Sequence, residues 1–165
     1  MLIQSGAQVN SLFWIKSLMP NDEGSTRRVL EDLEPFLRSK GVAFEMITPQ
    51  TGEELLLALK DIEQRAKAGV KPIIHFDTHG GPDAGLYIVP SDEFVGWDVL
   101  AESLREINVA TGNNLCVISA ACYGQKQVDE VTVLKPVPFY LLIGTPNWLS
   151  RTNVICILPG GIRDR

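Results

Sequence analysis

Short apolar runs alternate with helical patterns along this chain, and that alternation predicts an α/β fold. The run at residues 72–77 is apolar on both faces, which is typical of a strand that helices cover on two sides. Similar runs lie at 11–17, 42–48, 115–121 and 139–144. Their order predicts a mostly parallel central sheet of five or six strands with right-handed crossovers, in a three-layer α/β sandwich.

Apolar residues at helical spacing fill the gaps between the first three runs and recur before the fourth. Pro35 lies inside the first of these patterns and predicts a kink or a second helix start. Thr51 and Glu54 form a capping-box pattern at the start of the second. Trp97 opens the third pattern, where we expect it to anchor the helix start by packing.

The remaining segments predict a loop, a hairpin and an unusual tail. Residues 78–83 are rich in turn formers and predict a loop, while 86–89 and 93–95 resemble a small hairpin. No helical pattern follows the fifth run. Either the apolar residues 154–158 add a sixth strand, or the chain is a fragment or a large subunit. The length of 165 residues suits one domain.

Composition and charge exclude several classes of protein. The chain carries 15 basic and 20 acidic residues, a net charge of −5, whereas nucleic-acid-binding faces are usually basic. No run of 18 apolar residues exists, and the N-terminus lacks a secretory pattern, so we expect a cytoplasmic protein without a membrane partner. Three cysteines without a CxxC pair, together with two histidines, predict neither a disulfide framework nor a metal site. We expect no cofactor.

Two reactive side chains follow strands of the predicted sheet. His79 comes two residues after the end of the run at 72–77, and Cys122 comes directly after the run at 115–121. Open α/β sheets place their chemistry at the carboxyl ends of the strands. If these two strands are neighbours, the two side chains emerge at the same edge of the sheet.

A cysteine and a histidine at one edge have the chemistry of a nucleophile and its base. The thiol needs a base to become a thiolate at neutral pH, and the same histidine can later protonate a leaving amine. A tetrahedral intermediate also needs N–H donors for its oxyanion. The backbone N–H groups of Gly80 and Cys122 are the candidate donors. The segments that follow the two strands can therefore supply the nucleophile, the base and both oxyanion donors.

Neighbouring residues have plainer interpretations as well. Asp77 either orients the imidazole of His79, lines a substrate pocket for a basic side chain, or is an ordinary polar residue at a strand end. His75 and Cys116 lie within strands, where packing in the core is expected. If Asp77 lines the pocket, we expect a basic residue on the amino side of the cleaved bond.

The segment from Pro72 to Gly124 resembles the caspase-like cysteine peptidases, a family that includes metacaspases, paracaspases and the bacterial CHAT-type proteases. The resemblance rests on IIHFDTHGG and CVISAACYG, two apolar strands that end in His-Gly and Ala-Cys-x-Gly. It implies a single caspase-like domain over residues 1–165, truncated or large-subunit-like after about residue 147. It also implies regulated hydrolysis of protein or peptide bonds by His79 and Cys122, with an activating partner or a homo-oligomer.

Two departures leave room for other functions. Ala120 stands where caspases have Gln and metacaspases have Asp, so caspase-type Asp specificity is in doubt. The chain after residue 147 is short for a complete substrate groove, which keeps a catalytically inactive caspase-like interaction or dimerisation module as the alternative. A flavodoxin-like nucleotide binder is disfavoured, because residues 18–21 lack a glycine-rich fingerprint.

Overall fold

The computed structural model describes residues 6–132, 134–144, 155–158 and 161–163. Seven strands form the main sheet, and a hairpin extends one of them. The strands of the sheet are β1 (Ser11–Ser17), β2 (Ala43–Ile47), β3 (Pro72–Gly81), β6 (Cys116–Ser119), β7 (Leu141–Gly144), β8 (Ile155–Leu158) and β9 (Gly161–Arg163). The hairpin consists of β4 (Gly85–Ile88) and β5 (Glu93–Val95), as the sequence predicted.

The sheet is mostly parallel, which confirms the predicted fold class. Its order is β2-β1-β3-β6-β7-β8-β9. The four pairings from β2 to β7 are parallel, and β8 and β9 add two antiparallel pairings at the end. The sheet has seven strands rather than the predicted five or six, because β8 and β9 both add to its end.

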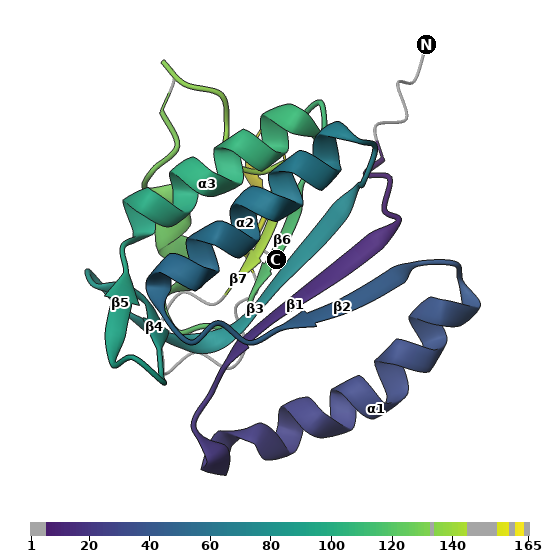
Figure 1. The fold of residues 1–165 in the computed structure, drawn as a ribbon. Helices are drawn as coiled ribbons and strands as arrows, with labels where there is room; N and C mark the ends of the chain where they lie inside the picture. The colour runs from purple at the N-terminus through teal and green to yellow at the C-terminus, as the bar shows by residue number, and fades with distance from the viewer. Residues whose placement is uncertain (1–5, 133, 145–154, 159–160, 164–165) are drawn as a thin grey trace.

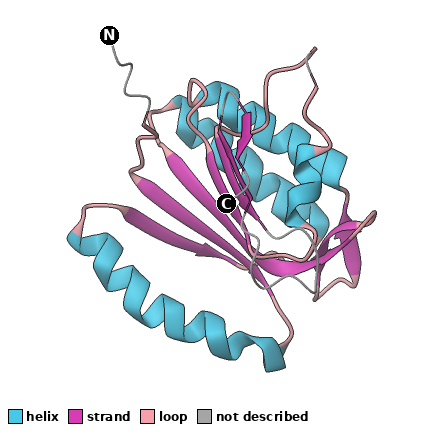
Figure 2. Cartoon of the chain, turned by 180° about the vertical axis from the view of Figure 1, so that it is seen from behind, coloured by secondary structure: helices cyan, strands magenta, loops and turns pink. Residues whose placement is uncertain are grey.

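Helices lie on both faces of the sheet and complete three layers (Figures 1 and 2). α2 (Gly52–Lys67) and α3 (Trp97–Ala110) lie side by side on one face and bury the main core against it. α1 (Glu23–Ser39) lies on the other side, beside the β2 edge, and is preceded by a single 3-10 turn, η1 (Pro20–Asp22). A second 3-10 helix, η2 (Gly124–Val128), follows β6.

The helix starts show how local sequence sets the boundaries. The Thr51 hydroxyl accepts a hydrogen bond from the Glu54 backbone N–H at 3.1 Å, which caps α2 as predicted. The Glu54 carboxylate accepts from the backbone N–H of Gln50 rather than from Thr51 itself. α1 continues through Pro35 as one helix, so a second helix start at that residue is ruled out. Pro35 is exposed, and water can therefore hydrate the carbonyl that loses its donor.

β3 is longer than the sequence predicted. The expected loop at 78–83 is wrong for its first four residues, because the strand continues to Gly81 and contains His79. The strand changes partner along its length: residues 72–78 pair with β1, and residues 79–81 pair with β4. Gly81 packs closely against Ala84 in the turn between the two strands, where a Cβ would lie 3.1 Å from that of Ala84, and a local pattern of turn formers did not reveal this pairing.

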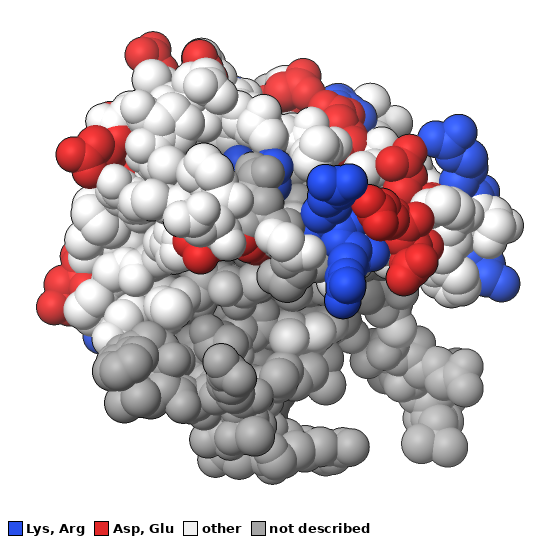
Figure 3. All heavy atoms as spheres, turned by 90° about the horizontal axis from the view of Figure 1, so that it is seen from below, with Lys and Arg blue, Asp and Glu red and all other residues white. Residues whose placement is uncertain are grey.

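Acidic and basic side chains are mixed on the surface. On the face seen in Figure 3, described basic side chains lie beside acidic ones. On α1, Arg27 pairs with Glu31 and Arg38 pairs with Glu34, each one helical turn apart. Within the described ranges, no helix is long and apolar enough to cross a membrane.

Candidate active site

The strands that lead to His79 and Cys122 pair with each other in the sheet. The two strands are parallel neighbours, and Ile73 lies opposite Cys116 with an offset of 43 residues. The same offset separates His79 from Cys122. The Ala120 backbone N–H extends the ladder by donating to the Phe76 carbonyl at 2.9 Å. The condition that the two strands are neighbours is therefore met in the fold.

Gly80 makes a close approach that joins the two strand ends directly. A Cβ atom at this position would overlap the carbonyl oxygen of Cys122 and lie 3.4 Å from the Trp97 ring. The Trp97 indole N–H donates to the Gly81 carbonyl at 3.0 Å, so the start of α3 anchors the end of β3. Only glycine leaves room for the backbone of Cys122 against that of Gly80.

The segment after Cys122 has an unusual backbone. Tyr123 has φ +62°, a left-handed conformation that is uncommon for a bulky residue. Gly124 follows, and a Cβ there would overlap the side chain of Ser119 at the end of β6. In the described part of the chain, no residue accepts a hydrogen bond from the Cys122 backbone N–H. Strained residues of this kind concentrate at functional sites, and this one turns the chain immediately after the candidate nucleophile.

His79 is held by a residue that the sequence analysis did not identify. Its Nε2 lies 3.0 Å from a carboxylate oxygen of Asp22, in the turn before α1. The side chain of His79 is 43% exposed and that of Asp22 is 48% exposed, so the imidazole is open to solvent. The two residues are 57 positions apart in the chain, and no local pattern connects them.

Asp77 is engaged in structural contacts on the α1 side of the sheet. One of its carboxylate oxygens accepts from the Thr26 hydroxyl at 2.6 Å and from the Trp14 indole N–H at 3.2 Å. These bonds tie the first turn of α1 to β1 and β3. The predicted role of Asp77 in a substrate pocket stays a prediction.

A hollow of about 380 Å³ lies beside the end of β3, between the start of α3 and η2. Trp97, which also contacts Gly80, forms part of its wall. Its charged lining residues are Asp83, Asp98, Asp129 and Glu130, together with Lys126. The hollow therefore offers a mostly acidic surface next to the candidate nucleophile loop.

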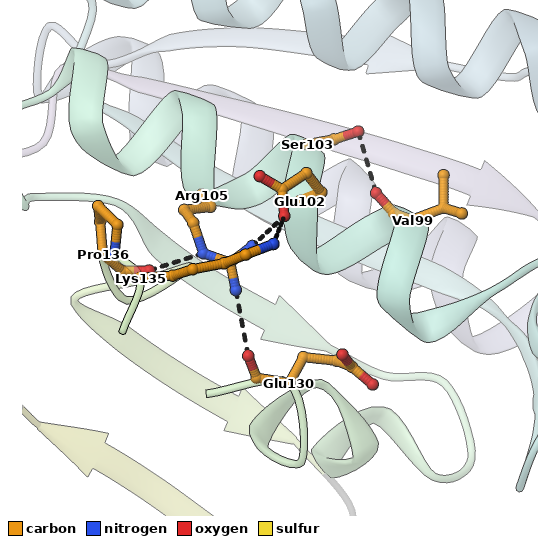
Figure 4. A network of polar contacts seen from close by, with 7 residues as sticks. All are labelled: Val99, Glu102, Ser103, Arg105, Glu130, Lys135 and Pro136. Carbon is orange, nitrogen blue, oxygen red and sulfur yellow. Dashed lines mark hydrogen bonds and ion pairs between the residues drawn. The ribbon is translucent and has the colours of Figure 1, made fainter. Parts of the chain in front are cut away.

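Arg105 fastens the segment that follows the candidate nucleophile to α3 (Figure 4). Its guanidinium is 7% exposed and pairs with Glu102 one turn away. It also donates to the backbone carbonyl of Pro136 at 2.7 Å and to that of Glu130 at 3.1 Å. Asn108, on the same helix, donates to the carbonyl of Val137 at 2.9 Å. Two buried polar side chains of α3 thus position the chain between η2 and β7.

The other cysteines and the second histidine lie away from this edge. Cys116 is buried in β6, as expected of a core residue. Cys156 belongs to β8, and its side chain lies outside the described residues. His75 stacks on Trp14 with ring centroids 3.8 Å apart. Burial lowers the pKa of His75 from 6.5 to about 4, and the nearby charge of Asp77 opposes this shift only in part.

We expect the stability of the protein to fall below neutral pH because of His75. The unfolded chain binds a proton on this residue at about pH 6.5 and the folded chain only at about pH 4. The unfolded state therefore gains protons first as the pH falls. Between pH 7.5 and pH 5, the free energy of unfolding should drop by about 2 kcal/mol from this residue. Urea unfolding of the wild type and of His75→Phe, which keeps a ring on Trp14, measures the effect. An equal pH dependence in both proteins would contradict it.

Comparisons with known proteins give no family for this chain. No family model matches it, and no curated protein matches it. Among solved structures, it is similar to a protein from Clostridium acetobutylicum described as a cystathionine beta-lyase involved in aluminum resistance, with 17% sequence identity and a TM-score of 0.44. The match covers 83% of this chain and 30% of the other. A similarity at this level assigns neither a family nor a function.

Proposed function

We propose that this protein is a caspase-like cysteine endopeptidase that hydrolyses peptide bonds through Cys122 and His79. The observation that carries the proposal is the contact between the two strand ends: Gly80, next to His79, packs directly against the backbone of Cys122. The parallel pairing of β3 with β6 supports it, since this pairing of neighbouring strands ends three residues before His79 and Cys122, at the carboxyl edge of the sheet.

The proposed reaction follows the usual course of acyl transfer to a thiol. The Cys122 thiol gives its proton to the imidazole of His79, and the thiolate attacks the carbonyl carbon of the peptide bond. Backbone N–H groups of Gly80 and Cys122 stabilise the oxyanion of the tetrahedral intermediate. The protonated imidazole then gives its proton to the departing amine, and water hydrolyses the thioester with His79 as base.

Charge around the site favours substrates with basic side chains. Four acidic residues line the hollow beside Trp97, and a charge-assisted contact with Lys or Arg would hold a substrate there. Ala120, before the nucleophile, offers no group to bind such a side chain. We therefore expect faster cleavage after Arg or Lys than after Asp, in a panel of fluorogenic peptides that differ only at that position.

A second candidate is a catalytically inactive interaction module. It is favoured by apolar side chains that α1 and β2 leave open: Val29 is 50% exposed, Phe36 is 56% exposed and Met46 is 49% exposed. A surface of this kind can bind a partner chain. The module requires no special reactivity of Cys122, so thiol chemistry distinguishes the two candidates.

Alkylation of single cysteines tests the proposal. Iodoacetamide is expected to modify Cys122 in the native protein far faster than the buried Cys116, measured by mass spectrometry of digested peptides. His79→Ala should slow the modification of Cys122 roughly tenfold or more, because the thiol loses its base. Cys122→Ala should abolish peptide cleavage, while Cys116→Ala should leave it intact.

The second histidine provides the matched control. His75→Phe removes an imidazole from the same strand without touching the candidate dyad, and it should leave the alkylation rate of Cys122 unchanged. If His79→Ala and His75→Phe behave alike, the dyad does not exist and the interaction module becomes the better explanation.

A further inference from the structure

We propose that Asp22 is the positioning residue of the site, which orients the imidazole of His79 and balances its charge during the reaction. This inference rests on the proposed function. It starts from one contact, the 3.0 Å separation between a carboxylate oxygen of Asp22 and Nε2 of His79.

Two side-chain contacts, Asp22 to His79 and Thr26 to Asp77, hold the start of α1 on β3, because the spacing of the residues is similar on both elements. Asp22 and Thr26 are four residues apart at the start of a helix, a rise of about 6 Å. Their partners His79 and Asp77 are two residues apart on one face of a strand, a rise of about 6.6 Å. The hydroxyl of the buried Thr26 donates to the Asp77 carboxylate at 2.6 Å. This contact holds α1 against β3 and thereby keeps the exposed Asp22 next to His79.

The turn before α1 fixes Asp22 from its own side. Its backbone N–H donates to the Met19 carbonyl at 2.9 Å and closes the 3-10 turn η1. The Asp22 side chain caps no backbone N–H of α1. Its carboxylate therefore faces His79 rather than serving the helix that it precedes.

The contact assigns separate tasks to the two ring nitrogens. A carboxylate only accepts, so Nε2 carries the hydrogen that it donates to Asp22. Nδ1 then has the free electron pair that takes the proton from the Cys122 thiol, leaving a thiolate and an imidazolium. The Asp22 charge faces that imidazolium and stabilises it until the proton passes to the leaving amine. Asp22 itself touches neither the thiol nor the substrate.

A comparison of single and double variants tests this role. Asp22→Ala is expected to lower the alkylation rate of Cys122 and the kcat for peptide cleavage, both at least tenfold, while KM and Tm stay near wild type. Asp22→Asn should give an alkylation rate and a kcat between those of the wild type and Asp22→Ala, because the amide oxygen of asparagine still accepts from Nε2 but carries no charge. Glu31→Gln removes an equal charge from exposed α1 and should change nothing.

The double variant shows whether Asp22 acts through His79. Asp22→Ala added to His79→Ala should cause no further slowing of Cys122 alkylation, because the group that it positions is already gone. Equal slowing in both backgrounds would overturn the inference and assign Asp22 a general structural role. No slowing by Asp22→Ala, where His79→Ala does slow the reaction, overturns the inference alone. If His79→Ala has no effect, the proposed function fails and the role of Asp22 fails with it.

Discussion

Gly80→Ala is expected to lower peptide cleavage roughly 100-fold, because displacement of reacting groups by about 1 Å can cost that much. The new methyl group would overlap the Cys122 carbonyl oxygen, which is a backbone atom and cannot rotate away. The loop that carries the nucleophile must therefore move. Overpacking should also cost about 1–3 kcal/mol of folding free energy. Steady-state kinetics on the folded fraction, with urea unfolding of the same protein, measures both effects.

Gly24→Ala is the matched control for this change. Gly24 lies in the first turn of α1, and a Cβ there would meet no atom within 4 Å. Its substitution should leave cleavage unchanged and stability equal or slightly higher, because alanine favours helix. Full activity of Gly80→Ala would show that catalysis does not depend on the close contact between Gly80 and the backbone of Cys122.

Arg105→Ala is expected to lower the free energy of unfolding by about 3 kcal/mol, since a buried guanidinium loses hydrogen bonds to two backbone carbonyls and a gap replaces its side chain. Two backbone carbonyls, those of Glu130 and Pro136, would lose their donor. The Glu102 carboxylate would keep only Lys135 as a basic partner, at 3.1 Å. Urea unfolding with an unchanged m-value measures the loss.

Substitution of an exposed arginine is the control that shows how much the burial of Arg105 contributes to stability. Arg38 pairs with Glu34 on the surface of α1, with a side chain that is 80% exposed. Arg38→Ala should change stability by less than about 0.5 kcal/mol. Arg105→Ala should also open the chain between η2 and β7 to limited proteolysis in the native state. Similar stability losses in the two variants would contradict the anchoring role of Arg105.

The sequence by itself determined the elements and their order. The apolar run at 11–17 became β1 with the same bounds, because strand periodicity and the polar residues that flank the run are local signals. The predicted strand ends agree less well with the structure: the run at 115–121 forms a strand only over Cys116–Ser119. The predicted strands at His79 and Cys122 are neighbours because right-handed crossovers leave few other arrangements.

Only the tertiary structure decided which distant residues meet. β3 extends to Gly81 because a hairpin pairs with it, and β8 and β9 enlarge the sheet because the tail folds back. Asp22 reaches His79, and Arg105 reaches the chain after Cys122, across separations that carry no periodicity. Hydrophobic patterns report which face of an element is buried, whereas a polar contact depends on where two faces dock. The sequence therefore predicted the candidate nucleophile and base, and packing alone supplied the residues that position them.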